Sequence, residues 1–254
     1  MSSTTIASLV FACTIVGVVV GSVLRAIMPD HHIRDDSKDL VKIASGLIAT
    51  LVALVLGLLV ATAKSSFDAT NSGFTQIGAK IILLDRCLAR YGPEAADARV
   101  MLRQSVDRTI HRIWPEHHAL DAQKAELENA AAAEHLQDVI RHLTPANDDQ
   151  RAMWTQAQQT EAELLQLRWL LLEQEQLALP NVFVWVLMFW LLVLYTTFGL
   201  LAPRNITAYG ALAVCAVSIS AALFLVVEMN QPLVGMIKVS DAPMREALKV
   251  ISAK

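Results

Sequence analysis

Four apolar runs without a charged residue are the feature that most constrains the fold of this 254-residue chain. Each is long enough to cross a hydrocarbon core of ~30 Å, which takes about 20 apolar residues in a helix. Lipid offers no partners for backbone polar groups, so such segments are expected to be helical. The runs are Ile6 to Leu24, Ile43 to Ala63, Val182 to Leu201 and Ile206 to Val227. The sequence therefore predicts four membrane spans.

The stretch from Lys64 to Leu179 has a different composition, being charged and rich in Ala, Leu, Gln, Glu and Arg. Its first part has mostly apolar side chains at alternating spacings of three and four, typical of a helix packed along another helix. These are Phe67, Thr70, Phe74, Ile77, Ile81, Leu84 and Leu88. The pattern predicts a long stalk helix that continues the second span and ends at Tyr91-Gly92-Pro93.

Three more helices are predicted in this stretch, over about Glu94 to Ile113, about Ala119 to Leu143, and from Asn147 onwards. Asn147 has the character of an N-cap, with Gln150 at capping-box spacing. The last helix repeats the three-and-four spacing, so we expect it to lie antiparallel to the stalk helix. The tail from Pro243 to Val250 predicts a short amphipathic helix on the membrane or the stalk.

The predicted fold is thus all-α: a four-span helical membrane protein with a helical stalk domain inserted between spans two and three. Its segments are residues 1–63 for spans one and two, 64–179 for the stalk domain, 180–229 for spans three and four, and 230–254 for the tail. Basic residues near the membrane ends are balanced between the two sides, and only weakly favour a cytoplasmic stalk. We expect an integral protein of a bacterial inner membrane.

Span two carries small residues at helical spacing, bounded by Lys42 and Lys64. This small-residue stripe consists of Gly46, Thr50, Ala53, Gly57 and Ala61. One interpretation is close approach to a neighbouring helix. The other is a helix that lines a narrow path with a lysine at each mouth to attract anions. Span one has a comparable face through Gly17 and Gly21, which we expect to lie against span two.

Catalytic chemistry has little support in the sequence. The span cores hold no Asp, Glu, His, Lys or Arg away from their ends, where Glu228 closes span four and either pairs with Lys64 or reaches towards water. The soluble stretch offers His111, Glu116, His117, His118, His135 and His142 without a strong metal-ligand spacing, and His31-His32 lies in a charged loop. We expect no enzyme, no metal, no cofactor and no disulfide.

Several segments together resemble a family of membrane proteins described as bestrophin-like. The resemblance is carried by LVALVLGLLVATAKSSFD at the end of span two, by LLDRCLARYGPEAADARVMLRQSV followed by Ile113-Trp114-Pro115, and by QPLVGMIKVSDAPMREAL after span four. It covers most of the chain. Bestrophins proper are oligomeric anion channels whose second membrane helix lines the pore, so the resemblance implies that role for Lys42 to Lys64.

One departure concerns the pore constriction, which in bestrophins is formed by bulky apolar residues on that helix. No aromatic residue lies between Ile43 and Ala63, so Phe67 and Phe74 are the nearest candidates. We therefore expect a homo-oligomeric channel whose partners are membrane lipid, further copies of the chain and inorganic anions. No extended basic patch favours nucleic acid. The alternative is a membrane-anchored helical scaffold or sensor that acts through its stalk.

Overall fold

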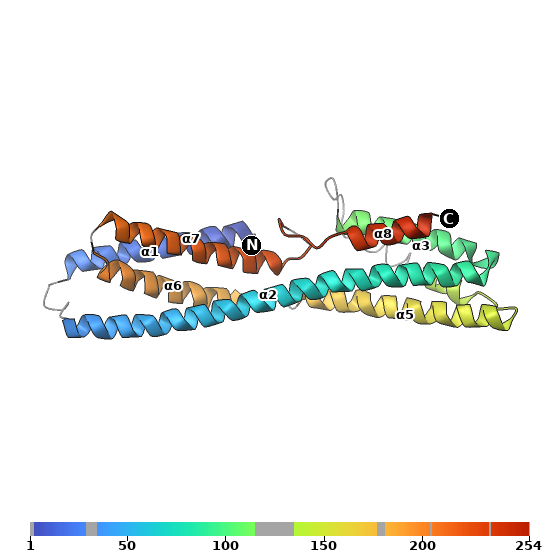
Figure 1. Cartoon of the computed structure of the whole chain (residues 1–254), viewed down its shortest axis with the longest axis horizontal. Coiled ribbons are helices and arrows are strands. Elements are labelled where there is room, and N and C mark those ends of the chain that lie inside the picture. Colours follow the sequence, from blue (N-terminus) through green and yellow to red (C-terminus); the bar gives the residue numbers. More distant parts are fainter. Residues whose placement is uncertain are drawn as a thin grey trace. The chain divides into compact units, whose positions relative to one another are not determined.

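The computed structural model describes residues 3–28, 35–114, 135–176, 181–203, 205–233 and 235–253, and every regular element in these ranges is helical (Figure 1). The elements are α1 (Ser3–Ile27), α2 (Asp35–Tyr91), the 3₁₀ turn η2 (Pro93–Ala95), α3 (Ala96–Ile113), α5 (Asp148–Gln176), α6 (Asn181–Leu201), α7 (Ile206–Met229) and α8 (Ala242–Ser252). A further stretch, 135–141, is also helical. The all-α prediction is confirmed.

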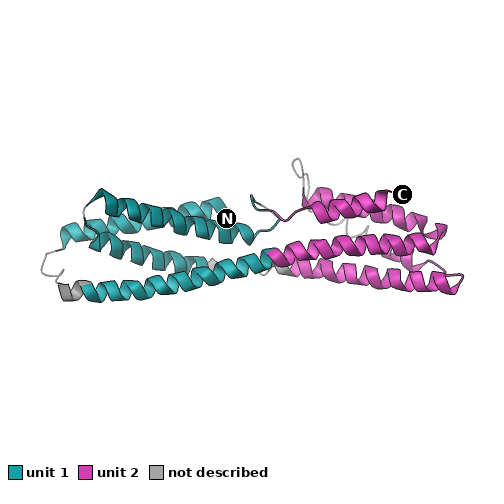
Figure 2. Ribbon diagram, viewed as in Figure 1, with its two compact units in different colours: residues 1–67, 178–237 teal, residues 68–177, 238–254 magenta. Residues whose placement is uncertain are grey.

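The chain divides into two compact units (Figure 2). Unit 1 consists of Met1–Phe67 and Ala178–Ile237, and unit 2 of Asp68–Leu177 and Lys238–Lys254. Helix α2 belongs to both, because it continues without a break through Phe67. The boundary falls close to Lys64, where the sequence changes from an uncharged apolar run to a charged amphipathic helix.

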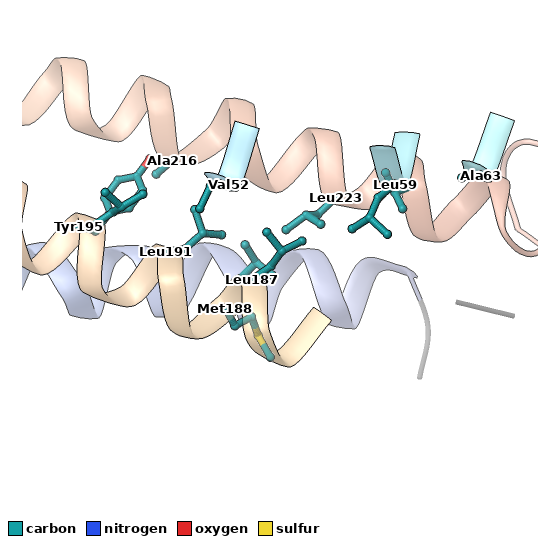
Figure 3. Packing of buried hydrophobic residues seen from close by; sticks show 12 residues of the cluster. Val52, Leu59, Ala63, Leu187, Met188, Leu191, Tyr195, Ala216 and Leu223 are labelled. Carbon is teal, nitrogen blue, oxygen red and sulfur yellow. The ribbon is translucent and has the colours of Figure 1, made fainter. Parts of the chain in front are cut away.

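Unit 1 holds the apolar runs, and all four lie in helices long and apolar enough to cross a membrane. Its core is built from facing apolar side chains of α1, α2, α6 and α7, among them Val52, Leu191, Tyr195 and Leu223 (Figure 3). Many other apolar side chains point outward, such as Val19, which is 54% exposed. An apolar outer surface is what a helix bundle in lipid requires.

Span one packs differently from the sequence-based expectation. Its glycine face lies against α6 rather than span two: a Cβ at Gly17 would touch Leu192 and Tyr195, and one at Gly21 would overlap the backbone of Thr196. On α6, Gly199 in turn abuts the backbone of Val18. Small residues on both helices let the two backbones approach closely. The prediction failed because helix spacing identifies a face but not its partner.

In unit 2, the last part of α2 and helix α5 lie antiparallel, as predicted. Moving towards the end of α2, Gly73 faces Leu171, and Lys80 pairs with Glu163. At the end of α2, the Gln150 side chain donates to the Tyr91 carbonyl at 3.0 Å. Residues later in α2 thus meet residues earlier in α5.

The start of α5 confirms Asn147 as its cap. The Gln150 amide donates to Asn147 Oδ1 at 2.8 Å, and the Gln150 side chain accepts from the Ala146 amide at 2.8 Å. The side chain thus bonds the amide one residue before the one that a regular capping box uses. Of the predicted helix from Ala119 to Leu143, residues 119–134 lie outside the described residues.

The tail forms α8, as expected. Its buried face, Met244, Ala247 and Ile251, identifies the side that packs, and α8 packs on α3. The Trp114 indole N–H donates to the Val239 carbonyl at 2.9 Å, which holds the approach to α8 in place. The tail helix therefore lies on the helical unit that contains the predicted stalk, one of its two expected positions.

Candidate pore-lining surface on α2

Helix α2 turns one face towards the rest of unit 1. That face carries Ser45, Val52, Leu59 and Ala63, each at most 6% exposed. Seven- and four-residue spacings place these side chains on one side of the helix. Val52 and Leu59 lie in the core that Leu187, Leu191 and Leu223 share (Figure 3). The remaining circumference of α2 is left for other contacts.

The small-residue stripe lies on this remaining circumference. Gly46, Thr50, Ala53, Gly57 and Ala61 are all exposed, as are Lys42 and Lys64 at its ends. No atom lies within 4 Å of where a Cβ would stand at Gly46 or Gly57. Among the described residues, then, no helix of the same chain covers these two glycines. This separates them from Gly17, Gly21 and Gly199, which are packed.

A second exposed face of α2 is strongly apolar. At 100° per residue it is centred about a quarter turn from the small-residue stripe. It is formed by Leu40, Ile43, Leu47, Leu51, Leu54 and Leu58, between 43% and 72% exposed. Helix α2 therefore exposes two faces of different chemistry: a bulky apolar one suited to lipid, and a smooth one.

The stripe offers few polar atoms within the apolar segment. The Thr50 hydroxyl donates to the Gly46 carbonyl at 2.8 Å, so its proton is used within the helix while its oxygen can still accept. No ionisable side chain lies between Lys42 and Lys64. A surface of this kind cannot bind an ion tightly, and weak binding is a condition for rapid conduction.

Each end of the stripe carries a lysine with a neighbour on the same helix. Lys42 forms an ion pair with Asp39 at 3.0 Å, and both side chains are mostly exposed. Exposed pairs of this kind contribute about 0–1 kcal/mol, but Asp39 still offsets the lysine's charge. Lys64 stands over the Phe67 ring, 5.9 Å from its centroid, a cation–π arrangement.

The two candidate constriction residues lie in different units. Phe67 is half-buried in unit 1. Phe74 belongs to unit 2, is 4% exposed and packs edge-on against Trp114, with ring centroids 5.0 Å apart. The Phe74 ring is thus occupied by contacts within its own unit, whereas that of Phe67 is partly accessible.

The polar residues weighed for catalysis do not converge. Among the described residues, no group of three or more His, Cys, Asp and Glu side chains could hold a metal ion. His111 and His142 each bond a backbone carbonyl one turn earlier, and His135 is exposed. His31, His32 and the stretch Glu116 to His118 lie outside the described residues.

The sequence did not indicate the surroundings of Glu228 or the burial of the Tyr195 and Ser220 hydroxyls. Glu228 was expected to pair with Lys64 or to reach for water, but it is 2% exposed and bonded to Ser3 and to the backbone. Tyr195 Oη and Ser220 Oγ are buried with no partner among the described residues. Hydropathy marks their helices as apolar and gives no signal of where single polar atoms lie.

Among the described residues every regular element is helical, and four helices are long and apolar enough to cross a membrane, so the architecture is that of a polytopic membrane protein. The chain belongs to the bestrophin-like family, since the family model called Bestrophin-like domain matches residues 11–244. This match includes all of α2 and most of both units. Neither a curated protein nor a solved structure matches the chain.

Proposed function

We propose that the chain forms a homo-oligomeric anion channel in which α2 lines the pore. The observation that carries this proposal is the exposed small-residue stripe, open at Gly46 and Gly57 and ending in Lys42 and Lys64. In a ring of subunits the stripe faces the axis, while the leucine face contacts lipid or a neighbouring subunit. Membership of the bestrophin-like family supports the assignment.

Charged and uncharged residues have different roles along the proposed pore. The lysines raise the local concentration of anions at the two mouths, because like-signed rings attract counter-ions. Lys64 is the lysine chosen to test selectivity, because it lies next to Phe67 at the end of the stripe. Phe67, half-buried one turn beyond Lys64, is the proposed constriction. The smooth wall between the lysines holds no charge to trap a passing ion.

The proposal divides the chain into a membrane part and a stalk. Residues 64–179 form the helical stalk between spans two and three, hold the subunits in register and lie in the cytoplasm of a bacterium. A cysteine introduced at the exposed Arg151 would report its side: a membrane-impermeant thiol reagent should label it in inverted inner-membrane vesicles and not in spheroplasts. Labelling in spheroplasts would show the opposite orientation, with the stalk on the periplasmic side.

The channel is tested by anion flux from vesicles that contain the purified protein. Gly57→Trp fills the stripe and should reduce the flux, while Lys64→Glu should shift selectivity from anions towards cations. Gly210→Trp is the matched control, because Gly210 on α7 is equally open but lies off α2. Unchanged flux and selectivity in both α2 variants would overturn the proposal.

A scaffold or sensor that acts through the stalk is the second candidate. The observation in its favour is an exposed apolar pair on α5, where Trp169 is 70% and Leu170 50% exposed. Exposed tryptophan is characteristic of protein interfaces. If this function holds, Trp169→Ala should abolish a cellular phenotype while Gly57→Trp leaves it unchanged, and vesicles should show no flux.

A further inference from the structure

Glu228 is an ionisable side chain that the proposed pore does not use. It lies in the last turn of α7 and is 2% exposed. A carboxylate removed from water is destabilising unless hydrogen-bond donors replace the lost hydration. The surroundings of Glu228 must therefore supply such donors.

Three donors converge on this carboxylate from two segments of unit 1. The Met236 and Ile237 amides both donate to Oε1, the second at 3.3 Å, and the Ser3 hydroxyl donates to Oε2. All three recorded partners donate, as an ionised carboxylate requires. The carboxylate thus joins the first turn of α1 and the last turn of α7 to the turn that follows α7.

Gly235 makes the arrangement possible. Its φ of 112° lies in a region that L side chains rarely adopt, and a Cβ at this position would overlap Glu228 Oε1. The glycine therefore allows the backbone to come close to the carboxylate and aims the next two amides at it. Successive amides that point at one anion form a nest, a recognised anion-binding conformation.

We propose that Gly235, Met236, Ile237 and Ser3 form an anion-binding nest for a carboxylate, with Glu228 as its built-in ligand. Glu228 is a positioning residue: its charge holds the start of α1 and the turn at residues 235–237 against the end of α7. Because the ligand is tethered, its effective concentration is in the millimolar range or higher, so the nest is normally filled. This inference does not depend on ion conduction.

The test removes the tethered ligand and supplies a free one. In the full chain purified in detergent, Glu228→Ala should speed hydrogen exchange of the Met236 and Ile237 amides by about tenfold or more, the loss expected for charge-assisted hydrogen bonds. Sodium formate should restore the protection with saturation. Sodium chloride at the same ionic strength should restore clearly less, because a planar carboxylate matches both sets of donors.

Two further variants separate charge from shape. Glu228→Gln keeps the side-chain size, so it should fold where Glu228→Ala fails, and should show weaker protection of the same amides that formate does not restore, because the amide still fills the site. Gly235→Ala distorts the nest but keeps the carboxylate, so formate should have no effect on it.

The outcomes divide cleanly. Unchanged exchange in both Glu228 variants would overturn the proposal. Equal rescue of Glu228→Ala by formate and chloride would also overturn it, because the effect would then be salt screening and not binding of a carboxylate. If Glu228→Ala does not fold, exchange in Glu228→Gln decides: wild-type protection refutes a role for the charge, and reduced protection supports it. Anion flux is not the readout, so failure of the pore proposal leaves this result intact.

Discussion

The Arg99 guanidinium donates two parallel hydrogen bonds to the carboxylate of Asp85, Nε to Oδ1 at 2.8 Å and Nη2 to Oδ2 at 3.0 Å. The pair joins α2 to α3 across the turn at Gly92, inside unit 2. Only 4% of the Asp85 side chain and 19% of the Arg99 side chain are exposed. Bidentate pairs of this kind fix geometry as well as adding energy.

Removal of Arg99 should destabilise unit 2 strongly. Arg99→Ala leaves Asp85 buried without its partner, so we expect a loss of about 3 kcal/mol in the free energy of unfolding. Arg151→Ala, which breaks an exposed pair with Asp148 at 3.8 Å, should change it by less than about 0.5 kcal/mol. Denaturant unfolding followed by circular dichroism measures both. Equal effects would mean that the buried pair contributes no more to stability than the exposed one.

Glycines of α1 and α2 should respond oppositely to the same substitution. Gly21→Ala places a methyl group against the α6 backbone, which cannot move aside, so we expect a loss of about 1–3 kcal/mol. Gly57→Ala meets no atom within 4 Å and should leave the melting temperature equal or slightly higher. Thermal unfolding in detergent compares them. A large loss at Gly57 with dissociation of the oligomer would show that the stripe packs between subunits.

Unit 2 should lose stability as pH rises, through Glu161. Burial raises the pKa of this carboxyl above its ordinary value of 4.5, although Arg141 and Gln137 partly counteract the shift. The folded state then holds its proton more tightly than the unfolded state. The contribution is therefore present below pH 4.5 and lost as pH increases through the raised pKa.

The contrast between two neighbouring glutamates checks this sign. Glu161→Gln should flatten the decline in unfolding free energy above about pH 4.5. A hydrogen bond from Lys80 lowers the pKa of Glu163, so this residue contributes stability above pH 4.5 that is lost as pH falls through the lowered pKa. Glu163→Gln should therefore remove a loss on the acid side. Identical pH profiles for the two variants would refute the assignment.

The Tyr195 hydroxyl should be dispensable for stability. Tyr195 lies in the apolar cluster of unit 1 (Figure 3). It is 1% exposed, and its hydroxyl oxygen has no partner among the described residues. A buried polar atom without a partner is destabilising, so Tyr195→Phe should leave the melting temperature equal or higher. Tyr195→Ala should lower it by creating a cavity in the core of unit 1. A clear loss in the phenylalanine variant would indicate that an ordered water or another subunit bonds the hydroxyl.

The apolar runs and helix-ending residues were sufficient to predict most helices. The second helix ends at Tyr91 because Gly92 takes a positive φ that other residues rarely adopt. The cap at Asn147 forms because its side chain accepts from the Gln150 amide nearby. The lysine-bounded stripe is likewise a matter of spacing, which the helix converts directly into a face. Its use as a pore wall remains a prediction.

The sequence alone determined the helical class, the four apolar helices and the small faces of α1 and α2. Tertiary structure decided which face meets which partner: Gly21 packs on α6 and Gly57 stays open, although both are glycines in apolar helices. It also brought Ser3, from the other end of the chain, to Glu228. Periodicity records only neighbours within a helix, whereas partners distant in sequence are selected by how the helices pack together.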